Sequence, residues 1–75
     1  MPKLPRVSPA SVLRALKRAG FYERHQSGSH IKLRHVEKIG INVIVPFHQK
    51  DLTPKTLKSI ILQAGLTIEE FIELI

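Results

Sequence analysis

Cysteine and tryptophan are absent from this chain of 75 residues, and its only aromatic residues are three Phe and one Tyr. Without cysteine, no disulfide framework supports the fold, which fits a reducing compartment. No apolar run approaches the ~20 residues of a membrane span, and the first residues lack the apolar core of a signal peptide. We therefore expect a cytoplasmic protein without membrane contact, folded as a single domain over residues 1–75.

Acidic residues are scarce in the first two thirds of the chain. Residues 1–50 hold ten Lys or Arg and two acids, a net charge of +8, whereas residues 51–75 hold two Lys and four acids, a net charge of −2, and the sum is +6. A basic body with a mildly acidic tail suits a polyanion partner such as RNA. An excess of positive charge that serves only solubility would look the same, so charge alone leaves both readings open.

Two stretches have the pattern of helix starts. Ser8-Pro9 and Thr53-Pro54 each place a capping residue before a proline at the first helical position. Apolar residues at helical spacing follow both starts, and a glycine ends each stretch. Residues 67–70 read as a capping box that opens a short third helix. Residues 1–7 form a Pro-interrupted arm ahead of the first helix.

Three strands are expected between the two main helices, over residues 21–26, from residue 30 onward, and over residues 41–45. Turns over residues 27–29 and 36–40 separate them. The third stretch is rich in β-branched residues, which is typical of a strand that lies centrally or against a helix. The order α-β-β-β-α, with a short C-terminal helix, predicts an α+β two-layer domain. Both main helices then cover one face of the sheet and leave the other face open.

The open face should carry polar side chains from two strands. Alternation places His30, Lys32 and Arg34 on one face of their strand, with His30 at the mouth of the turn. If Gln26 pairs with His30 across the hairpin, six side chains share this face: Tyr22, Arg24, Gln26, His30, Lys32 and Arg34. A register slip of one residue would instead turn Arg24 inward and His25 outward.

This arrangement suits ribonuclease chemistry, because RNA carries its own nucleophile, the 2′-OH. Cleavage needs a base, an acid and cations near the phosphate. His30 can serve as the acid or the base, since histidine titrates near neutral pH, and Lys32 and Arg34 can supply charge. His48 is a candidate for the second proton carrier, and it reads equally well as a loop histidine. A solvated basic strand face with an idle histidine would show the same pattern.

Other chemistries fit less well. His25, His30 and His35 recur at an odd spacing, so His30 and His35 point to opposite faces of a strand. Without cysteine, and without a His pair on a helix turn, we expect no metal site and no cofactor. Ser29 and His30 are neighbours that point apart, and no acid stands ready to orient the imidazole, so a serine hydrolase is not expected.

Several motifs in this order resemble the HicA toxin family, small ribonucleases of bacterial toxin–antitoxin systems. The likeness runs from about Ser8 to Phe71 and rests on these segments: Ala19-Gly20-Phe21, Gly28-Ser29-His30, Val45-Pro46-Phe47-His48, Thr56-Leu57 and residues 60–67. The resemblance implies a double-stranded-RNA-binding-like fold that cleaves mRNA, and a cognate HicB antitoxin that covers the site. Two positions depart from the family pattern: His25 where an Arg is common, and Lys55 where a Gly is common.

The resemblance places the family's catalytic histidine on His30 and its Gly-Ser-His turn on Gly28 and Ser29. The family's Val-Pro-x-His segment falls on Val45, Pro46 and His48. We therefore expect a metal-independent endoribonuclease that is a monomer alone and a hetero-oligomer with a HicB-like antitoxin. The residues expected to bind RNA are Arg24, Ser29, Lys32 and Arg34.

Two other functions remain open on the sequence. A non-catalytic RNA-binding module could use the same basic face. A small partner-binding protein could instead use the apolar C-terminus, and the sequence leaves open whether residues 68–75 pack on the body or on a partner.

Overall fold

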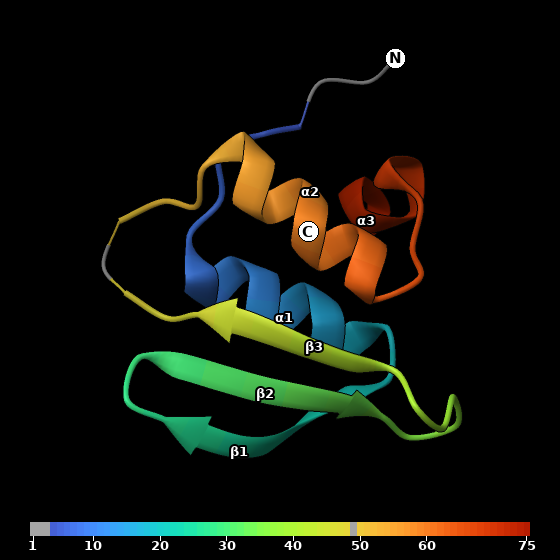
Figure 1. Ribbon diagram of the computed structural model, residues 1–75. Coiled ribbons are helices and arrows are strands. Elements are labelled where there is room, and N and C mark those ends of the chain that lie inside the picture. Colours follow the sequence, from blue (N-terminus) through green and yellow to red (C-terminus); the bar gives the residue numbers. More distant parts are fainter. Residues whose placement is uncertain (1–3, 49) are drawn as a thin grey trace.

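The computed structural model describes residues 4–48 and 50–75. Its elements follow in this order: α1 (Pro9–Arg18), β1 (Phe21–Ser27), β2 (His30–His35), β3 (Asn42–Pro46), α2 (Pro54–Gln63) and α3 (Ile68–Leu74). The three helices lie on one side of a three-stranded antiparallel sheet (Figure 1). The predicted α+β domain of double-stranded-RNA-binding-like type, with a short C-terminal helix, is therefore confirmed. Within the described part of the chain, no helix has the length and hydropathy that crossing a bilayer requires.

The predicted helix starts are confirmed by their capping bonds. The Ser8 hydroxyl accepts the N–H of Ser11 at 3.2 Å, and the Thr53 hydroxyl accepts the N–H of Thr56 at 3.2 Å. Each bond satisfies one of the N–H groups that a helix leaves without a partner at its start. Of the predicted arm over residues 1–7, residues 1–3 lie outside the described residues. Val7 is buried and its carbonyl accepts the N–H of Leu52 at 3.0 Å, which attaches the arm to the body.

The C-terminal helix α3 folds back onto the domain. The Thr67 hydroxyl accepts the N–H of Glu70 at 3.1 Å, and the Glu70 carboxylate accepts the N–H of Thr67 at 2.8 Å, which completes the predicted capping box. These bonds to Thr67 lower the pKa of Glu70. Phe71 is fully buried, and the Arg18 guanidinium donates to the carbonyl of Leu74 at 2.6 Å. Residues 68–74 therefore pack on the body.

The core lies between the sheet and the helices. Ile31 and Leu33 of β2 and Val43 and Val45 of β3 alternate with exposed or half-buried residues, as a sheet with one covered face requires. Opposite them, buried apolar residues of α1 and α2 fill the space between the layers: Val12, Leu13, Leu16, Leu57, Ile60 and Ile61. The other face of the sheet is left open by this packing.

The register of the hairpin differs from the prediction in its second half. Tyr22 pairs with Arg34 as expected, but a β-bulge between Glu23 and His25 leaves Arg24 without a partner in the ladder. From there on the pairing is shifted by one residue: His25 pairs with Lys32, Gln26 with Ile31, and Ser27 with His30. The predicted pairs Gln26–His30 and Arg24–Lys32 are wrong.

A mismatch between the two ends of the hairpin explains the bulge. The turn consists of Gly28 and Ser29 alone, which forces Ser27 opposite His30. At the other end Phe21 must face the core, and it pairs with His35. The two pairings differ in register by one residue, so one extra residue must be accommodated in β1.

Strand β3 is an edge strand, and β2 is the central one. Of the two positions expected for β3, the one against a helix is correct, since the backbone N–H of Ile44 donates to the side-chain oxygen of Gln63 on α2 at 3.3 Å. Pro46, two residues on, has no N–H to offer. The free edge of β3 is therefore poorly suited to pair with another strand.

Candidate functional site

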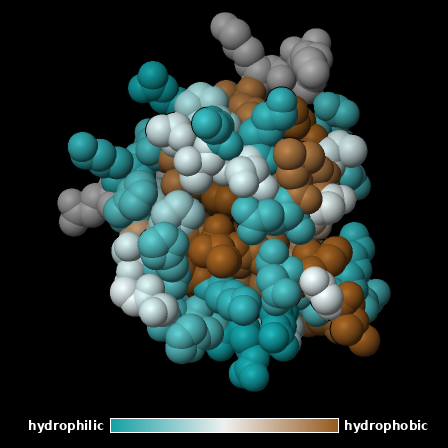
Figure 2. All heavy atoms as spheres, in the orientation of Figure 1, coloured by the Kyte–Doolittle hydropathy of each residue, from teal (hydrophilic) through white to brown (hydrophobic). Residues whose placement is uncertain are grey.

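The open face of the sheet draws on all three strands. The observed register puts nine residues on it: Tyr22, His25, Ser27, His30, Lys32, Arg34, Asn42, Ile44 and Pro46. Lys32 and Pro46 are half-buried and the others are exposed. Hydrophilic side chains gather over the lower part of Figure 2, where the strands of Figure 1 lie. The bulge thus replaces Arg24 and Gln26 of the predicted set with His25 and Ser27.

His30 begins the central strand beside the tight turn. Gly28 has φ +57°, and a Cβ there would meet no atom within 4 Å, so the backbone conformation rather than lack of space calls for glycine. The carbonyl of Ser29 accepts the N–H of Phe47, which ties the turn to the end of β3. His30 lies between Ser27 and Pro46 in neighbouring strands and is exposed. Its imidazole makes no hydrogen bond with any described residue and is open to a ligand.

Two cations follow His30 on the same face of β2. Lys32 and Arg34 stand two and four residues further along, about 7 and 13 Å at the usual rise of a strand. The Arg34 Nε donates to the side-chain oxygen of Asn42 at 3.2 Å, which holds the guanidinium over the sheet. Arg24 is exposed but sits in the bulge, away from the predicted place opposite Lys32. The structure thus brings His30, Lys32 and Arg34 into one row and leaves Arg24 outside it.

His48 lies past the end of β3, two residues after the partner of His30. It is exposed and lines a hollow of about 320 Å³ with Phe47 and with residues 8–10 at the start of α1. No hydrogen bond among the described residues joins His48 to His30. The structure therefore puts the two histidines near the same end of the sheet without linking them directly.

His35 at the far end of β2 has a role that motif reasoning missed. Its ring is half-buried, with Nε2 at 2.8 Å from the carbonyl of Ala19, and its Nδ1 accepts the N–H groups of Glu37 and Lys38, both at 3.0 Å. Because Nδ1 accepts twice, the ring proton is assigned to Nε2, which donates to Ala19. His35 therefore connects the end of α1 to the β2–β3 loop. The only signal in the sequence was alternation, which placed it on the covered face.

The His35 ring also packs tightly against its neighbours. It meets the Phe21 ring edge-on, with centroids 4.9 Å apart. A Cβ at Gly20 would lie 2.8 Å from His35 Nε2, and Gly20 has φ +100°. Gly20 is therefore required both by its backbone conformation and by the close approach of the ring.

The histidines divide between the two faces of the sheet. His25 and His30 lie on the open face and His35 on the covered face. Over residues 4–48 and 50–75, no group of three or more His, Asp or Glu side chains is placed to hold a metal ion. Lys32 and Arg34 are the cations that share the open face of β2 with His30.

Comparison with known protein families shows to which family the chain belongs. Residues 10–66, three quarters of the sequence, match the model described as the HicA toxin of bacterial toxin–antitoxin systems. The chain belongs to the HicA toxin family. It is accordingly a toxin of a toxin–antitoxin system, and its family implies a cognate antitoxin as partner. A search of curated proteins finds no match.

The HicA match covers the parts of the structure that form the site. It spans the whole sheet, with the Gly28-Ser29 turn, His30 and His48, and it ends shortly after α2. Helix α3 lies outside the matched residues. The matched residues therefore take in the sheet and most of α1 and α2, and α3 follows them in the chain.

Proposed function

We propose that this HicA-family toxin cleaves mRNA as a metal-independent endoribonuclease, with His30 as a general acid or base. The observation that carries the proposal is the placement of an exposed imidazole beside a tight turn, in line with Lys32 and Arg34 on an uncovered face. An RNA strand can reach this face without any movement of the helices. Basic side chains close to a proton carrier are what phosphate-ester cleavage by the 2′-OH needs.

The proposed reaction is a transfer within the RNA. The 2′-oxygen loses its proton and attacks the adjacent phosphorus, and the bond from phosphorus to the 5′-oxygen breaks as that oxygen gains a proton. The products are a 2′,3′-cyclic phosphate and a free 5′-hydroxyl. His30 would carry one of these two protons, and Lys32 would stabilise the negative charge that builds up on the phosphate. Arg34, which Asn42 holds further along the strand, would bind the RNA next to the cleaved bond.

His48 is the proposed helper for the second proton. It follows Pro46 by two residues, and Pro46 pairs directly with His30. An imidazole at this end of the sheet could approach the phosphate from the side opposite His30. Ser29, in the turn, is proposed to contact the RNA backbone there, and Arg24 to add charge at the outer strand.

The reaction type can be tested by incubating the purified toxin with mRNA, with and without EDTA. We expect cleavage to persist in EDTA and to leave 2′,3′-cyclic phosphate ends, because cations of the protein stabilise the phosphate. Loss of cleavage in EDTA that magnesium restores would contradict the proposal. A preparation purified identically from cells that lack the toxin controls for contaminating ribonuclease.

A non-catalytic role is supported by one observation. No hydrogen bond from the described residues orients the His30 ring, so the same basic face could bind RNA without cutting it. The same incubation separates these functions: RNA that is bound and recovered intact indicates a binding module.

We further propose that the cognate antitoxin is HicB-like and lays acidic or polar groups over the open face. The toxin would be a monomer alone and part of a hetero-oligomer in the complex. Opposite charges at such an interface favour rapid association and mask the site. Hydrogen exchange should show protection of residues 24–34 in the complex. Protection confined to residues 66–75 would instead place the antitoxin on the C-terminal helix.

A further inference from the structure

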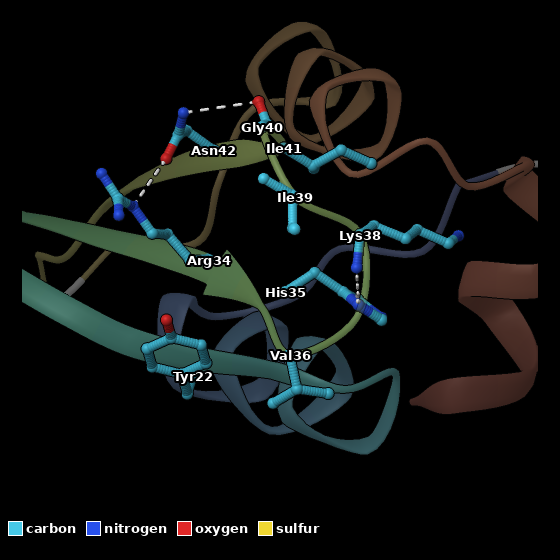
Figure 3. Close-up of a pocket in the computed structure, with 9 residues that line it drawn as sticks. All are labelled: Tyr22, Arg34, His35, Val36, Lys38, Ile39, Gly40, Ile41 and Asn42. Atoms are coloured by element: carbon cyan, nitrogen blue, oxygen red, sulfur yellow. Dashed lines mark hydrogen bonds between the residues drawn. The ribbon is translucent and has the colours of Figure 1, made fainter.

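A second hollow lies at the opposite end of β2 from His30. Its volume is about 390 Å³, within the range of small-ligand pockets. Residues at the ends of the three strands and in the β2–β3 loop line it (Figure 3). The loop contributes Val36 and Ile39, which are 65% and 99% exposed. One wall is therefore apolar and open to solvent, as the hydrophobic patch at the right of Figure 2 shows.

The floor of this hollow is a row of three side chains across the sheet. Tyr22 pairs with Arg34, and Arg34 pairs with Asn42, so one residue comes from each strand. Tyr22 is 42% exposed. The Arg34 Nε is bonded to the Asn42 side-chain oxygen, which leaves the terminal guanidinium nitrogens without a partner among the described residues (Figure 3).

The amide of Asn42 also retains bonding capacity. Its nitrogen makes one long contact, 3.5 Å to the carbonyl of Gly40, and its oxygen accepts one bond, from Arg34. An amide has two N–H donors and two acceptor sites, so one of each is free to meet a ligand. An exposed aromatic ring beside a held guanidinium and a partly free amide is a set of groups that stacks on a nucleobase and reads its edge.

We propose that this hollow binds one unpaired base of the RNA, which stacks on Tyr22 and is read by Asn42, while the free nitrogens of Arg34 bind the adjoining phosphate. This inference rests on the proposed function, since the RNA is the strand that His30 cuts. Arg34 lies four residues from His30, about 13 Å along the strand. The base bound here thus belongs to a nucleotide near the cleaved bond but not at it. Such a subsite gives the toxin a preference for a single-stranded stretch at a set distance from the cut.

The test uses binding rather than cleavage. A His30→Ala toxin is titrated with short single-stranded oligoribonucleotides in which one base at a time is removed, leaving an abasic sugar. We expect one abasic position to weaken binding by roughly tenfold to a hundredfold, the usual effect of losing one base–aromatic stack. Adding Tyr22→Ala should weaken binding of the intact strand by a similar factor and abolish the sensitivity at that position.

Two further variants distinguish the loss of the Tyr22 ring from a general loss of structure. Tyr22→Phe keeps the ring and should keep the sensitivity, and Leu62→Ala, on the exposed side of α2, should bind every oligonucleotide like the parent. Asn42→Ala should lower discrimination between bases at the same position.

Distinct results separate failure of this inference from failure of the proposed function. If the strand binds but Tyr22→Ala behaves like Leu62→Ala, the hollow is not a base site. If Tyr22→Ala releases the cognate antitoxin and leaves RNA binding intact, the hollow belongs to the antitoxin and the inference is overturned. If no oligonucleotide binds to the parent at all, the proposed RNA function itself fails.

Discussion

The two histidines that begin and end β2 occupy opposite environments. His30 lies on the open face, beside a two-residue turn, and its imidazole is exposed. His35 lies on the covered face, where three backbone groups bond to its ring and Phe21 packs against it. The imidazole of His30 thus has no hydrogen-bond partner among the described residues, whereas the imidazole of His35 is fixed by three hydrogen bonds. The difference indicates which histidine is available to a substrate and which one stabilises the fold.

The glycines near these histidines differ in the same way. Gly28 beside His30 has open space around it, whereas Gly20 beside His35 has the ring pressed against it. A ligand can approach the turn beside His30, whereas the space between Gly20 and the His35 ring has no room for one. One strand therefore carries an exposed histidine suited to chemistry at its start and a packed histidine that anchors α1 and the β2–β3 loop at its end.

The largest expected effect comes from His30→Ala. We expect RNA cleavage to fall by about a hundredfold to ten-thousandfold, the usual contribution of a positioned proton carrier. The free energy of unfolding should change by no more than about 0.5 kcal/mol, because the side chain is exposed. Cleavage rates and urea unfolding measure the two quantities. RNA binding should persist, since Lys32 and Arg34 remain.

Two outcomes would contradict the different roles assigned to His30 and His35. If His30→Ala unfolds the domain, the residue is structural and both histidines stabilise the fold. If the variant cleaves RNA at the parental rate, His30 takes no part in the reaction. His48→Ala, measured beside it, tests the proposed second proton carrier.

The next largest effect is expected from His35→Ala, which should lower stability and leave cleavage nearly unchanged. The substitution removes the bonds to Ala19, Glu37 and Lys38, and it should lower the free energy of unfolding by about 1–3 kcal/mol. The cleavage rate per folded molecule should stay close to that of the parent. His25→Ala is the matched control, since His25 is exposed on the open face and makes no hydrogen bond among the described residues. A loss of cleavage without a loss of stability would mean that His35 takes part in the chemistry.

The smallest effect concerns the cations between the two ends. Binding of single-stranded RNA should weaken as salt rises, because Lys32 and Arg34 release counterions from the phosphates they contact. Lys32→Gln and Arg34→Gln should each lower the slope of log affinity against log salt by about 0.7. The affinity of the His30→Ala background, measured from low to high salt, gives the slope. Lys58→Gln on α2 should leave it unchanged, and an equal change there would show that only net charge matters.

Local signals in the sequence predicted much of this fold. The three helices begin at Ser8, Thr53 and Thr67, and each start is marked by a capping bond between residues three apart in the sequence. A short stretch of sequence is therefore enough to predict them. Alternation along β2 predicted the faces of His30 and Lys32, because the side-chain period of a strand does not depend on its partners. The HicA resemblance placed the same His30 in a family pattern, and the family match includes that region.

Pairing between distant segments could not be predicted in the same way. The bulge at Arg24 arises because the turn and the buried Phe21 demand registers that differ by one residue, and neither signal is visible from β1 alone. It changes which side chains lie on the open face, so His25 and Ser27 stand there rather than Arg24 and Gln26. The position of β3 at the sheet edge, and of α3 on the body, likewise depends on contacts that no local pattern contains.

By itself, the sequence determined the elements, their caps, the face on which His30, Lys32 and Arg34 lie, and the family. These depend on short-range geometry and on motifs that are read along the chain. Only the tertiary structure decided the hairpin register, the three bonds that hold His35, and the row of Tyr22, Arg34 and Asn42 beneath a hollow. The physical reason is that each of these joins segments whose pairing depends on how the whole core packs, and a pattern within one segment does not encode the position of another.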